Sequence, residues 1–244
     1  MEEKNIIKGK NVIIEDGAVI GNDCVIGHNV VIHIGVEIGD NVVIGDNTVL
    51  GKEPFVSGSS ATTTKETLPD LVIANNVKIG ACCVIYRGAS LEENCFVGDL
   101  ATIREKSLIG KKTIIGKGAT IENKCKIGKR VKIETNAYIT AFSTIEDYCF
   151  IAPEVTFTND NFLGRTEERK KHFGGPVLKR GSRIGANATI LPGIVIGEDA
   201  LVAAGSVVTK NLEARKIYAG VPAKYFGEVP EKQLVEKQNF FEEI

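Results

Sequence analysis

A short stretch after position 157 gathers side chains that are suited to chemistry on a polar substrate. Thr158, Asn159 and Asp160 follow one another, and Arg165 and His172 come a few residues later. Amide and hydroxyl groups hydrogen-bond other polar groups, a carboxylate orients a neighbour or accepts a proton, and a guanidinium pairs with anionic groups. Histidine ordinarily titrates near neutrality, so His172 is a candidate general base. The stretch predicts a site for a polar, charged substrate.

These residues interrupt a repeat with a period of six. Aliphatic side chains recur at every sixth position over 14–50, over 73–151 with Phe157 as the last member, and over 178–208. Neither a helix stripe nor a long sheet strand has this period, which is the signature of a parallel β-helix. Glycine often follows the aliphatic residue, and a small residue stands four places beyond it, as tight corners and a narrow interior require. The pattern predicts an all-β solenoid.

Two insertions and a C-terminal segment depart from the repeat. The first insertion, about 51–72, is polar and rich in small residues, and the second, 158–177, is dense in charged and amide groups. Long excursions from a compact scaffold often carry function. We expect one domain over 1–228 and a short helix over 229–244, because apolar residues near helical spacing occur there, namely Leu234, Val235, Phe241 and Ile244.

Composition excludes several classes of protein. The 244 residues carry a formal net charge of −1, which gives no reason to expect nucleic acid or an acidic membrane as a partner. There is no apolar run of about 18 residues and no apolar segment of the secretory type near the N-terminus, so a cytoplasmic location is expected. Five of the six cysteines occupy the small position of the repeat, which predicts packing rather than metal binding: Cys24, Cys83, Cys95, Cys125 and Cys149.

The repeat resembles that of the hexapeptide-repeat acyltransferases. The segment 146–160, which ends in Phe-Thr-Asn-Asp, looks like the signature of the nucleotide-sugar amino N-acetyltransferases within that family. The resemblance implies a left-handed parallel β-helix with three hexads per coil, about nine coils, two loop excursions and a capped end. It also implies a homotrimer with coenzyme A between neighbouring coils.

The same resemblance implies a reaction. Acetyl-CoA is the expected acyl donor, no metal is expected, and the acceptor is the amino group of a sugar carried by UDP or dTDP. Relatives with this signature can lack a histidine base, in which case the amine attacks the thioester directly and the departing thiolate ultimately takes the proton. Asn159 and Asp160, or alternatively His172, are then the candidate catalytic residues.

The C-terminal hexads resemble the coils of the family that bind acetyl-CoA. Small residues there let the pantetheine arm lie against the backbone, and lysines meet the phosphates as point charges. The residues implied are Ala186, Ala203, Ala204, Gly205, Lys210 and Lys224.

With 18 residues per coil, the start of the second insertion falls in a column of unusually polar corner positions. Arg104 and Glu122 stand two coils or more before Thr158 in this column. Either they form a surface ion-pair ladder of little energetic value, or they line a substrate groove together with Thr158 and Arg165. Both interpretations remain open at this point.

Three other functions deserve comparison. One is an O-acetyltransferase or another hexapeptide acyltransferase that uses His172 as a base. A second is a non-catalytic binding solenoid. A third is a zinc enzyme of the γ-carbonic anhydrase type, suggested by His28 and His33 on the same fold, although a zinc site needs a further ligand. Saturable binding of acetyl-CoA distinguishes the acyltransferases from the other two.

Overall fold

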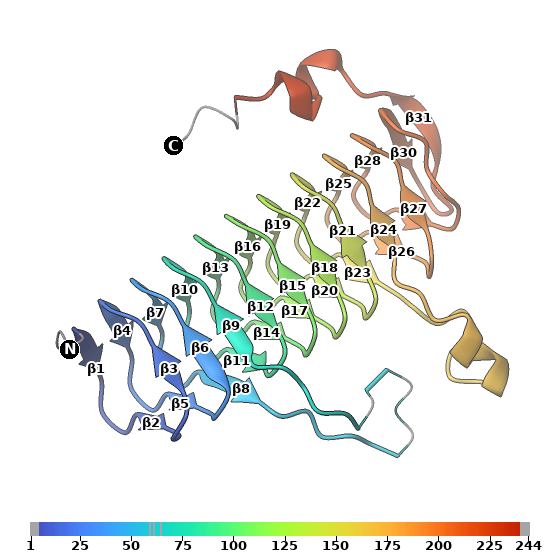
Figure 1. Cartoon of the computed structure of the whole chain (residues 1–244). Coiled ribbons are helices and arrows are strands. Elements are labelled where there is room, and N and C mark those ends of the chain that lie inside the picture. The colour runs from blue at the N-terminus through green and yellow to red at the C-terminus, as the bar shows by residue number, and fades with distance from the viewer. Residues whose placement is uncertain (1–4, 59, 61, 64, 240–244) are drawn as a thin grey trace.

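The computed structural model is a long prism of stacked coils with three flat faces, and both excursions project from one side of it (Figure 1). It describes residues 5–58, 60, 62–63 and 65–239. From β1 to β29 the strands rotate through the three sheets, so that every third strand joins the same sheet and pairs in parallel with the strand one coil away. The all-β parallel β-helix predicted from the hexads is confirmed.

Each face of the prism is one sheet. Sheet A comprises β1 (Ile6–Lys8), β4 (Cys24–Ile26), β7 (Val43–Ile44), β10 (Lys78–Ile79), β13 (Phe96–Val97), β16 (Ile114–Ile115), β19 (Lys132–Ile133), β22 (Phe150–Ile151), β25 (Arg183–Ile184), β28 (Leu201–Val202), β30 (Lys216–Ala219) and β31 (Lys224–Glu228).

Sheet B comprises β2 (Ile13–Ile14), β5 (Val31–Ile32), β8 (Val49–Lys52), β11 (Val84–Tyr86), β14 (Thr102–Ile103), β17 (Thr120–Ile121), β20 (Tyr138–Ile139), β23 (Thr156–Phe157), β26 (Thr189–Ile190) and β29 (Val207–Val208). Sheet C comprises β3 (Val19–Ile20), β6 (Val36–Ile38), β9 (Leu71–Ile73), β12 (Ser90–Leu91), β15 (Leu108–Ile109), β18 (Lys126–Ile127), β21 (Thr144–Ile145), β24 (Val177–Leu178) and β27 (Val195–Ile196).

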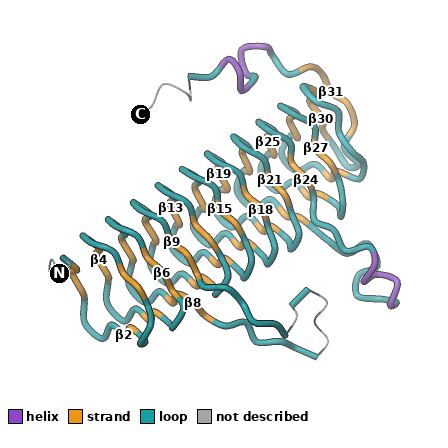
Figure 2. Tube along the Cα trace, in the orientation of Figure 1, coloured by secondary structure: helices purple, strands orange, loops and turns teal. Residues whose placement is uncertain are grey.

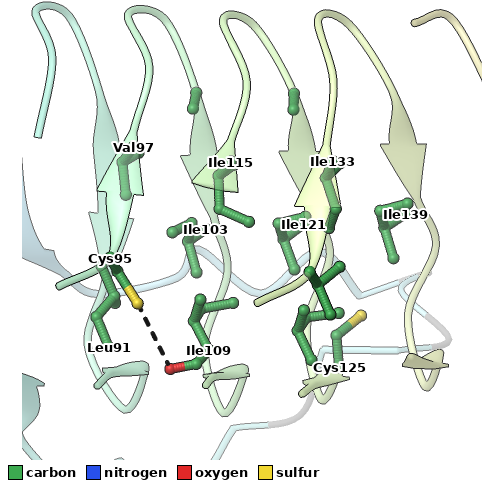
Figure 3. Packing of buried hydrophobic residues seen from close by; sticks show 14 of the residues in the cluster. Leu91, Cys95, Val97, Ile103, Ile109, Ile115, Ile121, Cys125, Ile133 and Ile139 are labelled. Atoms are coloured by element: carbon green, nitrogen blue, oxygen red, sulfur yellow. Dashed lines mark hydrogen bonds between the residues drawn. The ribbon is translucent and has the colours of Figure 1, made fainter. Parts of the chain in front are cut away.

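The aliphatic residue of each hexad points into the prism. The register pairs Ile79 with Val97 and Val97 with Ile115, so the side chains of neighbouring coils stack directly on one another. Every member of the series except Ile14 is buried, and Figure 3 shows the resulting columns in the central coils. Because the strands are only two to five residues long, this packing and the ladder between coils hold each strand in place.

The small position of the hexad also has a polar role. The Cys125 thiol donates to the carbonyl of Thr140 at 3.2 Å, and the Ser107 and Thr113 hydroxyls donate to carbonyls of the next coil at 2.7 and 2.8 Å. Burial raises the pKa of Cys125 to about 12, so the thiol stays protonated and keeps its donor. The five cysteines predicted to pack are all buried, whereas Cys82 is exposed.

Close approach of the coils explains the glycine that follows many of the aliphatic residues. A β-carbon on Gly110 would lie 2.5 Å from the carbonyl carbon of Gly128 in the next coil, which no side chain tolerates. The left-handed backbone of the corners falls elsewhere and is often occupied by asparagine, as at Asn41 and Asn76, where φ is 57° and 60°. Glycine is therefore required here for space rather than for a positive φ.

The coil count differs slightly from the nine predicted. The three sheets contain 12, 10 and 9 strands. The sequence count missed strands at both ends because β1 and β30 lie outside the aliphatic series, yet β1 pairs with β4 and β30 pairs with β28. At the C-terminal end β31 turns back antiparallel on β30 and closes that edge of sheet A.

The C-terminal segment differs from the predicted helix. It forms two 3-10 turns, η2 (Glu231–Gln233) and η3 (Val235–Lys237), with Leu234 extended between them. Leu234 and Val235 are buried, and the Val235 amide donates to Asp199 Oδ1 at 3.0 Å, so docking on the last coils outweighs helix propagation. Phe241 and Ile244 lie outside the described residues. Within the described chain, no helix has the length and apolarity needed to cross a bilayer.

The inward and outward residues of one strand provide a test of the core. Ile109 on β15 is 1% exposed and its neighbour Leu108 is 49% exposed. We expect Ile109→Ala to lower the free energy of unfolding by about 2–5 kcal/mol, because it leaves a cavity between stacked coils. Urea denaturation followed by circular dichroism measures this.

Leu108→Ala is the matched control, with an expected change of about 0.5 kcal/mol or less. Equal losses from the two substitutions would contradict the assignment of the inward face.

Candidate active site

Both excursions leave the prism from the same edge. The first, residues 53–70, follows β8, and the second, residues 158–176, follows β23; both strands belong to sheet B, and both excursions return into sheet C. We call this corner the BC edge. Figures 1 and 2 show the two excursions on the same side of the prism, separated along its long axis. Two insertions separated by residues 71–157 of the sequence thus border one surface.

Between the two excursions the BC edge carries a partly buried charge cluster. Arg104 makes a bidentate pair with Glu105, with Nε to Oε2 at 2.8 Å and Nη2 to Oε1 at 3.0 Å. Its Nη1 lies 3.5 Å from Glu122 Oε2, one coil further on. The Glu105 side chain is 4% exposed and that of Glu122 is 20% exposed. This is more than a solvated ladder, because two carboxylates surround one guanidinium away from bulk water.

The first excursion covers this cluster. Arg104 Nη2 donates to Thr63 Oγ1 at 3.1 Å, and Asn123 Nδ2 donates to the Thr62 carbonyl at 2.7 Å. At the root of the excursion Arg87 pairs with Asp70 at 2.6 Å, and Leu68 is 5% exposed. The insertion that is polar and rich in small residues is therefore folded onto the scaffold over its described part, which lacks 59, 61 and 64.

Burial and charge set the protonation of the cluster. Burial lowers the pKa of Arg104, but the Glu105 hydrogen bonds and the charges of both glutamates outweigh it, so this pKa lies above its usual value. Burial raises the pKa of Glu122, with a further increase from Glu105, against the lowering effect of Arg104. Glu105 thus takes the stronger share of the guanidinium, whereas burial favours the protonated form of Glu122.

The second excursion is organised by Asp160. Its Oδ1 accepts the Phe162 amide at 2.8 Å, its Oδ2 accepts the Gly164 amide at 2.9 Å, and Arg169 Nη1 lies 3.5 Å from Oδ2. Desolvation raises the pKa of Asp160, but these donors outweigh it and hold the pKa below its usual value. Asp160 therefore shapes the loop, and its oxygens are already engaged by protein donors.

Asn159 has a different environment. Its main-chain carbonyl accepts the Gly174 amide at 3.4 Å, and this hydrogen bond closes the base of the excursion. The Asn159 side chain is partly exposed. No hydrogen bond within the described chain engages its carboxamide, so both the oxygen and the NH₂ are available to a ligand. Thr158, by contrast, donates its hydroxyl to the Ile190 carbonyl at 3.1 Å and stays with the scaffold.

Arg165 and His172 lie on the outer part of the excursion. Arg165 is exposed. His172 follows η1 (Glu167–Lys171), stacks on Phe162 with ring centroids 5.9 Å apart, and has its Nε2 3.7 Å from Glu168 Oε1. Its side chain is 58% exposed, and its described contacts include neither Asn159 nor Asp160. Asn159 and Asp160 therefore stand where the loop leaves the BC edge, and no described contact joins His172 to either of them.

Most residues predicted to bind coenzyme A lie at the other edge of sheet B. Ala186 follows β25, and Ala203, Ala204 and Gly205 follow β28, at the corner between sheets A and B, which we call the AB edge. The Gly205 amide donates to the Ala186 carbonyl at 2.8 Å, so the two corners are directly stacked. Lys224 begins β31 and pairs with Ala219 beside this corner, whereas Lys210 follows β29 at the BC edge.

The remaining histidines belong to the scaffold. His28 Nδ1 accepts the Lys10 amide at 2.8 Å, and His33 Nδ1 lies 2.9 Å from Glu15 Oε1. Within the described residues, no group of three or more His, Cys, Asp or Glu side chains is arranged to hold a metal ion.

Comparison with protein families agrees with the repeat. The family described as bacterial transferase hexapeptide (six repeats) matches residues 17–52 and 175–210. Both matched segments overlap the series of hexads. A second family, the GMPPB C-terminal domain, matches residues 54–145 between the two segments.

Curated relatives match over short segments. A dTDP-3-amino-3,6-dideoxy-α-D-galactopyranose 3-N-acetyltransferase of Aneurinibacillus thermoaerophilus is 46% identical over 57 residues, 23% of this chain and 30% of that protein. A 2,3,4,5-tetrahydropyridine-2,6-dicarboxylate N-acetyltransferase of Staphylococcus aureus is 46% identical over 55 residues, 22% of this chain. The chain spans less than a third of the length of these relatives, 30% and 23% respectively.

A solved structure matches over most of the length. The UDP-N-acetylglucosamine acyltransferase from Campylobacter jejuni covers 89% of this chain and 73% of its own, with a TM-score of 0.55 and 18% identity. At this identity the likeness concerns the fold of the hexapeptide-repeat prism.

Two residues of the candidate site were in the predicted column but were not selected from the sequence. Glu105 is the main partner of Arg104, and Asn123 is fully buried with its Oδ1 lacking a hydrogen-bond partner. The available signal was two consecutive polar residues at a corner that elsewhere begins with glycine. Sequence reasoning did not show that the first excursion would cover them.

Replacement by glutamine is expected to lower the free energy of unfolding at Glu105 but not at Glu122. Glu105→Gln removes one charged partner of Arg104 and should lower the free energy of unfolding by about 2 kcal/mol. Glu122→Gln removes a charge whose burial is unfavourable and should be neutral or stabilising. Thermal melts between pH 4 and pH 8 measure both.

The sign of the pH effect follows from the raised pKa of Glu122. Folding favours its protonated form, so this contribution to stability is present at low pH and is lost as the pH rises through the folded-state pKa. The advantage of Glu122→Gln over the natural chain should therefore grow from pH 4 to pH 8. A constant difference across this range would contradict the assignment.

Proposed function

We propose that this protein is an acetyl-CoA-dependent N-acetyltransferase that acts on the amino group of a nucleotide-linked amino sugar. The observation that carries the proposal is the unengaged carboxamide of Asn159 at the BC edge, beside a loop fixed by Asp160. Two relatives that share 46% identity with segments of the chain are named N-acetyltransferases, and one of them acts on a dTDP-linked amino sugar.

The charge of the BC edge fits an amine acceptor. The cluster of Arg104, Glu105 and Glu122 carries one positive and two negative groups when both carboxyls are ionised. An acidic balance attracts an amine in its ammonium form and disfavours an anionic group next to it. Arg165, which is exposed on the loop, has the fork geometry for the pyrophosphate of the nucleotide.

Acetyl-CoA, the acyl donor, would lie along the AB edge of the last coils. Ala204 and Gly205 are exposed there, and the space next to Gly205 is open. A pantetheine arm can approach the backbone at such a corner, and Lys224 supplies a positive charge for a phosphate.

The reaction needs no side-chain base in this proposal. The ammonium form of the acceptor first releases one proton to solvent. The neutral amine nitrogen then attacks the thioester carbonyl, the carbon–nitrogen bond forms, and the carbon–sulfur bond breaks to release coenzyme A thiolate, which takes up the second proton lost by the nitrogen. Asn159 holds the amine in position, and the fixed loop supplies the orientation that such an attack requires. The exposure of His172 and its stacking on Phe162 agree with a bystander role.

Acceptor and donor residues lie at opposite edges of sheet B within one chain. This arrangement supports a site formed between two copies, in which the AB edge of one copy faces the BC edge of the next. Such contacts are heterologous and close into a ring, and a homotrimer is the ring expected for this repeat.

Substitution of Asn159 tests the acceptor site. Asn159→Ala should lower kcat/KM for the sugar by about 100-fold, because a positioned polar contact made in the transition state is lost. Acetyl-CoA-dependent release of free thiol, measured with a panel of UDP- and dTDP-linked amino sugars, gives the rate.

Asn161→Ala, at an exposed position in the same loop, is the matched control and should retain activity. His172→Ala should also retain activity. Unchanged turnover in Asn159→Ala, or a loss confined to His172→Ala, would reject the proposed chemistry in favour of a histidine base.

Mixing two inactive variants tests the shared site. Ala204→Glu obstructs the donor edge, and Asn159→Ala disables the acceptor edge. After the two variants are unfolded together and refolded, about a quarter of the natural activity should return, since random mixing brings two intact edges together at one interface in four. No recovery, with both variants assembled normally by light scattering, would show that each site lies within one chain.

A second acceptor is supported by the relative from Staphylococcus aureus, whose named substrate is a dicarboxylate. The acidic balance of the BC edge argues against it, since two carboxylates on the acceptor would face Glu105 and Glu122. Including 2,3,4,5-tetrahydropyridine-2,6-dicarboxylate in the same assay panel decides between the two acceptor classes.

A further inference from the structure

A cavity of about 550 Å³ lies on sheet A, away from the BC edge. It is bounded by sheet A, by the corner between sheets C and A, and by the C-terminal segment that includes η2 and η3. Its lining includes Lys112, Arg130, Lys132 and Arg183, together with Phe150 and Gln238. Positive side chains from several neighbouring coils thus meet here.

The sheet register fixes part of this arrangement. Lys132 pairs with Phe150, and Phe150 pairs with Arg183, so the two cations stand on either side of the phenyl ring on consecutive outward positions. Adjacent strands are about 4.8 Å apart, which places the two charged side chains within reach of one small ligand. No ion pair in the described part of the chain involves Lys132 or Arg183.

Arg183 has hydrogen-bonding capacity that the protein leaves unused. Its Nη1 donates to Gln233 Oε1 at 2.9 Å, whereas Nε and Nη2 are buried without a hydrogen-bond partner. Burial lowers the pKa of Arg183, although the nearby charge of Asp199 opposes this effect. Buried guanidinium donors rarely stay unpaired in proteins, so these two nitrogens point to an anionic ligand.

None of the described residues that line the cavity is acidic. Asp199 Oδ1 accepts the Val235 amide at 3.0 Å, and burial raises the pKa of this carboxyl. Asp147 lies 3.6 Å from Lys129, and Glu198 lies 3.2 Å from Arg180. The balance of charge on the cavity wall is therefore positive.

We propose that this cavity is a binding site for a phosphoryl group, provided either by free phosphate or by a nucleotide whose base lies against Phe150. The guanidinium fork of Arg183 suits phosphate oxygens, and Lys132 adds a point charge on the other side of the ring. Gln238 and Asn239 border the cavity from the C-terminal segment, so a bound ligand bridges that segment to sheet A.

This site is separate from the proposed acetyl-transfer site. None of the residues that line the cavity belongs to the BC edge or to the donor corner at the AB edge. The inference does not rest on the proposed function and would stand for a protein with another activity.

Isothermal titration of the full chain with inorganic phosphate and with ADP tests the proposal. Both titrations are run in the Ala204→Glu background, so that binding at the proposed coenzyme A corner does not contribute. Lys132→Glu should weaken binding by about tenfold or more, because a charged partner of the phosphoryl group is replaced by a repulsive one. Lys132 is exposed, so this variant should fold normally.

Lys78→Glu is the matched control, because Lys78 faces outward from the same sheet but does not line the cavity. Tighter binding of ADP than of phosphate identifies a nucleotide, and equal binding identifies free phosphate; either result supports the site. Slower amide hydrogen exchange over 233–239 on ligand addition locates it. Absence of saturable binding, or equal effects of Lys132→Glu and Lys78→Glu, overturns the proposal.

Discussion

The stacking of coils at an interval of 18 residues is the constraint on which the rest of this molecule depends. Each inward aliphatic residue packs on its equivalents in the coils before and after it, and each strand is hydrogen-bonded to the same neighbours. A residue inserted within a strand would move every later side chain to the wrong face. Extra chain is therefore tolerated only at corners, where both excursions occur.

The same constraint places a polar cluster where a plain solenoid has glycine. At the BC edge, Arg104, Glu105, Glu122 and Asn123 occupy equivalent corners of two consecutive coils. Their burial is unfavourable for isolated charges, and it is offset by the bidentate pair and by hydrogen bonds that Arg104 and Asn123 donate to the first excursion. The first excursion and the charge cluster beneath it stabilise each other, so the first excursion is a structural part of the BC edge.

The three edges of the prism differ in chemistry. The BC edge carries amide and carboxylate groups beside the two loops, and the AB edge of the last coils carries small residues and open space. The corner between sheets C and A carries cations under the C-terminal segment. A rigid scaffold allows these surfaces to be specialised independently, because a substitution on one edge does not change the register of the others.

The sequence by itself determined the repeat, the inward residues, the two interruptions and the polar corner column, because a period of six is a local property that short-range geometry imposes on every coil. It also singled out Asn159 and the small residues of the last coils, whose type and spacing are visible without a structure.

The sequence did not determine that both carboxylate oxygens of Asp160 would accept hydrogen bonds from amides of its own loop. Nor did it determine that the first excursion would lie over Arg104 and Asn123. The first outcome depends on the conformation that the loop adopts around Asp160, and the second depends on contacts between segments tens of residues apart. The C-terminal segment shows the same limit: its apolar spacing suggested a helix, but the amide of Val235 bonds to Asp199 and the chain docks in 3-10 turns. Only the tertiary structure decides which of two local conformations satisfies a distant partner.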